Sequence, residues 1–113
     1  MKIQNPKILQ HTFLDDMYKD SYFPDPLVDQ VKAVLLELCM QIETQQPQDL
    51  DGLYRLSHFA TEQINDLQEA FDQANSEIET VARETISANV SFIAAAYGFV
   101  DADHEVLIET RDW

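Results

Sequence analysis

Basic residues are scarce in this sequence. Seven lysines and arginines face 21 aspartates and glutamates among 113 residues, which gives a formal net charge of −14. A surface of this charge repels nucleic acid and anionic lipid, so we expect no direct nucleic-acid binding and no membrane association. The same surface attracts cations and basic proteins.

Cysteine is nearly absent, because Cys39 stands alone and excludes an internal disulfide. It lies in the apolar run AVLLELCM, which is typical of a buried structural thiol. The sequence has no apolar stretch of about 18 residues that would span a membrane. The first residues, MKIQNPKILQHTF, lack the apolar region of a signal peptide. These features predict a cytoplasmic protein.

Turn-forming residues are also few. Two glycines and four prolines leave little room for the turns of a β domain, so the sequence predicts an all-α fold. Residues 1–113 have the length of a single domain that can bury one core without disulfides or metals.

The prolines and capping residues divide the chain into helices. Asn5, which precedes Pro6, is placed to cap the first helix. Ser76 and Glu79 have the spacing of a capping box, Gly98 is placed to end the helix that follows, and Asp101 or Asp103 is placed to cap a last one. We therefore expect a compact bundle of four to five helices with a short C-terminal helix. The predicted helices cover residues 6–19, 25–44, 49–73, 76–97 and a short segment ending near 109.

The apolar residues recur with helical spacing. Seven core positions in the third predicted helix fall on one narrow face: Leu53, Leu56, Ser57, Ala60, Ile64, Leu67 and Phe71. Apolar residues fill about half the circumference of the fourth helix, Val81 among them, so we expect this helix to be central. A second stripe on the second helix (Ala33, Leu36 and Met40) is expected to receive the N-terminal helix. The residues expected to be most buried are Leu35, Leu38, Leu53, Ile64, Leu67, Ile78, Ile86 and Ile93.

A polar face of the third predicted helix carries His58, Glu62, Asp66 and Glu69 at intervals of three or four residues. Such a set resembles ligands for a divalent metal. The face lies opposite the core stripe, however, and metal sites in bundles draw inward ligands from several helices. We therefore interpret it as a solvated acidic face and expect neither a metal nor another cofactor.

No catalytic signature accompanies these residues. None of the five serines stands in a G-x-S-x-G context, and two isolated glycines cannot form a phosphate-binding loop. Asn89 projects into the apolar side of the fourth helix, where it needs a hydrogen-bond partner. It is either a structural group that bonds to a neighbouring loop, or one wall of a small polar pocket with His58, Tyr97 or Tyr54.

Two aromatic residues suggest contact surfaces. Phe59 falls off the core stripe beside Arg55, as an interface anchor would, unless another segment covers it. Trp113 follows Arg111 at the end of the sequence, where it either packs back onto the body or anchors a partner. A binding face formed by Phe59, Glu62, Asp66 and Glu69 follows from this pattern.

The runs MYKDSYFPDPLVD, LELCMQIE, SEIETVARE, AYGFVDADHEVLI and RDW resemble a family of short acidic bacterial proteins catalogued as a domain of unknown function. The resemblance spans residues 13–113. It implies a cytoplasmic helical protein and supplies no activity and no functional residues.

The acidity is uneven: residues 47–75 carry six acids and one arginine, and residues 101–113 carry five acids and one arginine. This distribution favours a non-catalytic module that binds a basic protein, as small immunity proteins do when they neutralise basic toxins. The alternative is a small enzyme, or a protein that binds a metal or small ligand through polar groups near His58 and Asn89.

Overall fold

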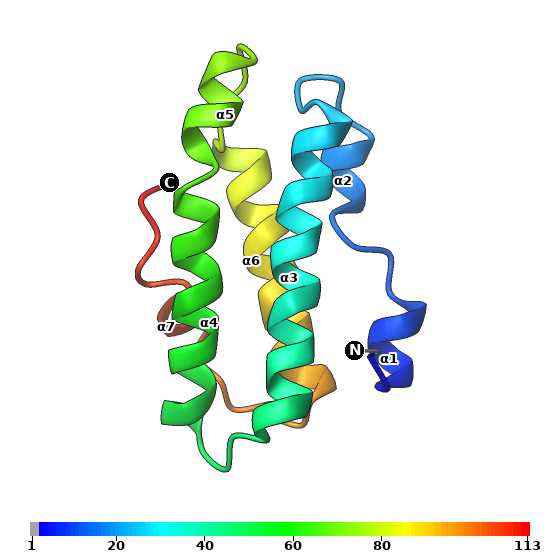
Figure 1. Cartoon of the computed structure of the whole chain (residues 1–113), viewed down its shortest axis with the longest axis vertical. Helices are drawn as coiled ribbons and strands as arrows, with labels where there is room; N and C mark the ends of the chain where they lie inside the picture. The colour runs from blue at the N-terminus through cyan, green and yellow to red at the C-terminus, as the bar shows by residue number, and fades with distance from the viewer. Residues whose placement is uncertain (1–2) are drawn as a thin grey trace.

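The computed structural model describes residues 3–113, and within this range it contains seven helices and no strand (Figure 1). The predicted all-helical bundle with a short C-terminal helix is confirmed. Three helices are long: α3 (Asp25–Gln45), α4 (Leu50–Asn65) and α6 (Thr80–Ala96). Four are short: α1 (Pro6–Gln10), α2 (Asp15–Tyr18), α5 (Gln68–Gln73) and α7 (His104–Leu107).

The helices form two layers. The antiparallel pair α3 and α4 makes one layer, joined by the turn that contains Pro47 (Figure 1). In the other layer α6 lies between α1 and α2 on one side and α7 on the other. The central position predicted for this helix is therefore confirmed. Within the described residues, no helix is both long and apolar enough to cross a membrane.

The core between the layers contains most of the residues that the periodicity selected. Seven of the eight residues expected to be most buried are buried: Leu35, Leu38, Leu53, Ile64, Ile78, Ile86 and Ile93. Leu67 is only half-buried, because it lies at the junction of α4 and α5 and not inside a continuous helix. The prediction for Val81 was also wrong, since this side chain is 39% exposed near the start of α6.

The N-terminal segment is two short helices and not the single helix predicted over residues 6–19. Asn5 caps α1 as expected, accepting the backbone N–H groups of Lys7 and Ile8. α1 ends at Gln10, because His11 is already extended (ψ 140°), and Leu14, which precedes α2, has a left-handed backbone (φ +57°). Neither conformation continues a right-handed helix, so the segment is divided between residues 11 and 14.

The predicted docking stripe on α3 was wrong as well. Ala33 is exposed, and the N-terminal segment packs against α6, with α2 also contacting α3. Phe13, Leu14 and Met17 are buried in this packing. Burying these three large apolar side chains removes more apolar surface from water than packing on the stripe that contains Ala33 would, so it stabilises the observed arrangement.

The predicted third helix is divided into α4 and α5. Asp49 caps α4 by accepting the N–H of Gly52, but the helix ends at Asn65 and a short turn precedes α5. At the end of α5, Asn75 adopts φ +61° and the N–H of Ser76 donates to the carbonyl of Phe71 at 2.9 Å. This pattern is a Schellman motif with asparagine in the left-handed position.

The predicted capping box was therefore wrong. Ser76 closes α5 and does not open α6, which begins at Thr80 after Glu79, with no side-chain cap. The end of α6 agrees with prediction, because Gly98 has φ +91° and follows the helix in a second Schellman motif. Asp103 caps α7 by accepting the N–H groups of the next turn, which selects it over Asp101.

Ile86 and Val81 give a matched test of this core. Both lie on α6, but Ile86 is fully buried and Val81 is partly exposed. We expect Ile86→Ala to lower the free energy of unfolding by about 2–5 kcal/mol. Val81→Ala should lower the free energy of unfolding by less than about 1 kcal/mol, because the Val81 side chain buries less apolar surface on folding than Ile86 does. Urea denaturation, monitored by circular dichroism, measures the free energy of unfolding of both variants. An equal decrease in the two variants would contradict the assigned packing of α6.

Candidate functional site

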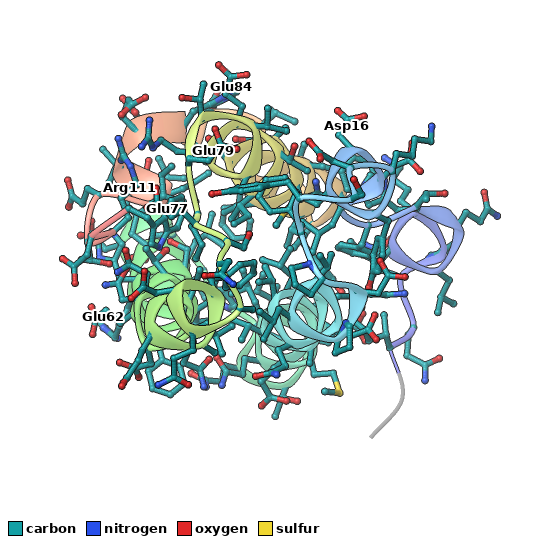
Figure 2. All side chains as sticks on the ribbon, turned by 90° about the horizontal axis from the view of Figure 1, so that it is seen from above. Asp16, Glu62, Glu77, Glu79, Glu84 and Arg111 are labelled. Carbon is teal, nitrogen blue, oxygen red and sulfur yellow. The ribbon has the colours of Figure 1, made fainter. Side chains whose placement is uncertain are left out.

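The three acids of the polar face predicted on the third helix are exposed to solvent. We call Phe59, Glu62, Asp66 and Glu69 the acidic ridge. It runs from α4 into α5, and Phe59 at its start is 50% exposed, so no other segment covers this ring. Figure 2 shows Glu62 at the outer edge of α4. Among the described residues, none of the three ridge acids forms an ion pair. No described lysine, arginine or histidine side chain lies within 4 Å of these carboxylates to neutralise them directly.

A neighbouring flank of α4 binds the C-terminal segment. His58 Nε2 lies 2.7 Å from the carbonyl oxygen of Val106, and Thr61 Oγ1 lies 3.5 Å from that of Leu107. One turn later, Asn65 Nδ2 donates to the Thr110 carbonyl at 3.0 Å. These bonds run along α4 in sequence order, so the segment lies parallel to the helix, as Figure 1 shows.

Both ends of this segment are also fixed. Asn65 Oδ1 accepts the backbone N–H of Asp112 at 2.9 Å, which places Trp113 against the body at 8% exposure. Near α7, the Tyr54 hydroxyl accepts the N–H of Asp103 at 2.9 Å. Of the two roles considered for the terminal tryptophan, the structure therefore assigns packing back onto the body.

His58 is thus a structural group and not part of the solvated face on which we placed it. Its side chain is 23% exposed, and Nε2 also lies 3.7 Å from a carboxylate oxygen of Glu109. His58 does lie on the side of α4 opposite the core stripe, as predicted. A helical face on that side stays solvated only where no other segment packs on it. The C-terminal segment, which is distant in sequence, covers this part of the face.

Asn89 is likewise a structural group. Its Oδ1 accepts the N–H of Leu14 at 3.3 Å and lies 2.8 Å from His11 Nε2, while its Nδ2 donates to the Thr85 carbonyl at 2.7 Å. The His11 ring stacks on Phe92, with ring centroids 3.9 Å apart. Asn89 therefore holds the left-handed link between α1 and α2 against α6.

Tyr97 lies at a third location. Its hydroxyl donates to Oε2 of Glu43, which also accepts the backbone N–H of Asn5, while Oε1 of Glu43 accepts the backbone N–H of Gln4. These residues line a groove of about 860 Å³ between the N-terminal segment and the ends of α3 and α6. His58, Asn89 and Tyr97 contact different segments and share no partner, so the structure does not bring them together into one pocket.

The polar groups of the Tyr97 groove shift each other's pKa. Burial raises the pKa of Glu43, but the hydrogen bonds from Tyr97, Gln4 and Asn5 outweigh it and leave this pKa below its usual value. Burial and the Glu43 hydrogen bond raise the pKa of Tyr97. Burial also raises the pKa of the neighbouring Cys39 thiol to about 12. The predicted buried structural thiol is thus confirmed, and Cys39 remains protonated at neutral pH.

The described residues contain no group of three or more His, Cys, Asp or Glu side chains placed to hold a metal ion. Sequence reasoning missed the roles of Thr61 and Asn65, which bind the C-terminal segment. The available signal was that Thr61 lies next to the core stripe of α4 although it is polar. A polar side chain there requires a partner, which Thr61 finds in the carbonyls of Ser57 and Leu107.

The sequence profile of a family of unknown function, DUF5713, matches residues 7–113. The chain belongs to this family. The match confirms the resemblance to a family of unknown function and extends it from residue 13 back to residue 7. No curated protein and no solved structure matches the chain. The assignment of function therefore depends on the chemistry of the surface and the cavities.

Trp113 allows the attachment of the C-terminal segment to be measured. It is the only tryptophan, so intrinsic fluorescence reports on this one residue. Asn65→Ala removes the bonds to Thr110 and Asp112, and we expect it to cost about 1–2 kcal/mol locally. The emission should shift to longer wavelength and acrylamide should quench it more strongly. Glu62→Ala on the same helix is the control and should change neither. Unchanged quenching in Asn65→Ala would contradict the proposed attachment.

Tyr97→Phe tests the Glu43 interaction. Glu43 has a lowered pKa in the folded protein, so its contribution to stability is present above its unfolded pKa and is lost as the pH falls through the folded value. Removing the Tyr97 hydroxyl should raise the pKa of Glu43. The decrease in stability that protonation of Glu43 causes at low pH should then become smaller. The carboxyl ¹³C shift of Glu43 measured against pH reports the change. Tyr54→Phe is the control, and an unaltered Glu43 titration in Tyr97→Phe would refute the coupling.

Proposed function

We propose that this protein is a non-catalytic module that captures a basic protein through its acidic ridge. The observation that carries the proposal is the combination of unpaired carboxylates with a half-exposed aromatic ring along α4 and α5. Carboxylates around such a surface steer a positively charged partner into contact and increase its association rate. An aromatic ring among them provides the apolar contact that slows dissociation.

The helix that carries the ridge suits this role. The opposite side of α4 is packed into the core, and another flank is fixed to the C-terminal segment. A charged face on such a rigid element pays little conformational entropy when a partner binds. An immunity-like inhibitor, which blocks a basic toxin by covering it, is the specific form of this function that we favour.

The same charge argues against nucleic acid as a partner, because both surfaces would be negative. The proposal includes a cytoplasmic location, which is supported by a single cysteine that is buried as a free thiol. The alternative of an enzyme or ligand-binding site near His58 and Asn89 receives no support from the geometry. Nε2 of His58 and both polar atoms of Asn89 already bind the chain itself.

Charge reversal at the ridge tests the proposal. The triple variant Glu62→Lys, Asp66→Lys, Glu69→Lys should fold normally, since these groups are exposed and unpaired. Immobilised wild-type protein should retain a basic protein from lysate, and the association rate measured with that purified partner should fall about tenfold or more between low and moderate salt. The triple variant should lose the steering and most of this salt dependence.

A second triple variant has the same net charge as the ridge variant and serves as its control. Asp16→Lys, Glu37→Lys and Glu84→Lys add the same charge on α2, α3 and α6, and Figure 2 shows Asp16 and Glu84 on the α2–α6 side, away from Glu62. We expect it to bind nearly as fast as wild type. If both triple variants slow association equally, net charge alone is responsible and the ridge is not the binding face. An association rate that is insensitive to salt and to both variants would reject electrostatic capture.

A further inference from the structure

Three residues that carry buried polar atoms without hydrogen-bond partners line one cavity. Among the described residues, four buried side-chain polar atoms lack a partner: Ser76 Oγ, Arg83 Nε, Ser91 Oγ and Trp113 Nε1. All but Ser91 belong to residues that line a single cavity of about 580 Å³. A buried donor without an acceptor carries a free-energy penalty, so such groups are rare and call for an explanation. Their concentration around one space indicates that an acceptor enters it.

Segments far apart in the sequence build this cavity. Ser76 is 1% exposed and uses its backbone N–H to close α5, which leaves its hydroxyl free for another partner. Arg83 comes from the first turns of α6. Trp113 is 8% exposed and is positioned by the bond between Asn65 and the N–H of Asp112. The attachment of the C-terminal segment to α4 therefore completes the cavity.

The charges around the cavity determine which acceptor it can take. Four carboxylates line it (Glu69, Asp72, Glu77 and Asp112) against the single cation Arg83. In the part of the chain that the structure describes, none of these carboxylates forms an ion pair. Figure 2 shows Glu77 where the chain passes from α5 to α6. An anion would be repelled, so the acceptor is a neutral oxygen such as a peptide carbonyl, and the carboxylates favour a cation beside it.

We propose that this cavity is an anchor pocket for an arginine or lysine on an extended segment of a basic partner protein. The Ser76 hydroxyl and the Trp113 indole N–H are closed to solvent in the free protein, so they turn toward the peptide carbonyl when it binds and donate hydrogen bonds to it. The cationic side chain pairs with the surrounding carboxylates. The volume lies within the range of about 300–1,000 Å³ that is usual for ligand pockets. This inference rests on the proposed function, because Glu69 belongs both to the acidic ridge and to the cavity.

The single tryptophan again supplies a reporter, since its indole N–H gives one NMR cross-peak. The probe is the blocked pentapeptide acetyl-Gly-Gly-Arg-Gly-Gly-amide, titrated into the ¹⁵N-labelled full chain. We expect a saturable downfield shift of the Trp113 indole signal, because its donor gains an acceptor. The same peptide with citrulline in place of arginine keeps the shape and removes the charge, and it should bind about tenfold more weakly.

Two serines form a matched pair of variants. Ser76→Ala removes a cavity donor and should weaken the arginine peptide about fivefold. Ser91→Ala removes a buried hydroxyl that also lacks a partner but does not line this cavity, so affinity should not change. Circular dichroism melting confirms that both variants are folded. Equal affinities in the two variants would overturn the assignment of Ser76.

The remaining outcomes separate this inference from the proposed function. If the peptide shifts only signals around Glu62 and Asp66, and Glu62→Lys with Asp66→Lys abolishes that binding, the ridge binds cations and the anchor pocket is refuted. A Trp113 shift produced equally by sodium acetate would identify an anion site and also overturn the inference. The absence of any shift at Trp113 would mean that the cavity takes no peptide. The proposed function is tested independently, by the association rates of the two charge-reversal triple variants with the basic partner.

Discussion

The hydrogen bonds between α4 and the C-terminal segment are the interaction on which the surface of this protein depends. His58 and Asn65 hold the backbone of this segment along one flank of α4. Without them a polar face of α4 would be uncovered and Trp113 would lose its position beside Ser76. One helix therefore serves three environments, with an apolar side toward the core, a polar side toward the segment and an acidic side toward solvent.

The second constraint is the net charge of −14. Self-repulsion of so many carboxylates destabilises a compact fold, and the described residues contain only two lysine or arginine ion pairs that oppose it, Lys19–Asp15 and Arg111–Glu105. The two-layer core provides the compensating stability, with fully buried side chains such as Leu35 and Ile86. Leaving the acids of the ridge unpaired keeps their field available for a partner, which is the physical basis of the proposed capture. High acidity also favours solubility, so the position of the acids matters more than their number.

Much of the fold could be predicted from the sequence, because helical periodicity and capping residues are local signals. Gly98 and Asn5 were placed correctly since their roles depend only on neighbours along the chain. Leu14 and Ser76 were not, because the left-handed link at Leu14 is held by distant Asn89, and Ser76 is drawn into closing α5. At Leu14 an interaction between distant segments decided the structure, whereas at Ser76 two local signals competed and the Schellman motif that ends α5 replaced the capping box.

The candidate site divides in the same way. The exposed ridge could be predicted, since Glu62 and Asp66 point away from a clear core stripe and nothing packs on them. The cover over His58 and the cavity beside Trp113 could not, because both arise where the C-terminal segment returns to a helix some 50 residues earlier in the chain. Spacing along one helix carries no information about a segment that packs on it from so far away.

A charge-swap experiment tests the central claim most directly. Once a basic partner has been purified, its surface lysines are changed to glutamate one at a time and each variant is paired with the Glu62→Lys protein. If the acidic ridge is the binding face, one of these exchanges should restore the association rate that Glu62→Lys alone has lost, because the two charges attract again with their signs reversed. If no partner variant recovers the rate, while wild-type protein still binds the wild-type partner, Glu62 does not face the partner and the account is contradicted.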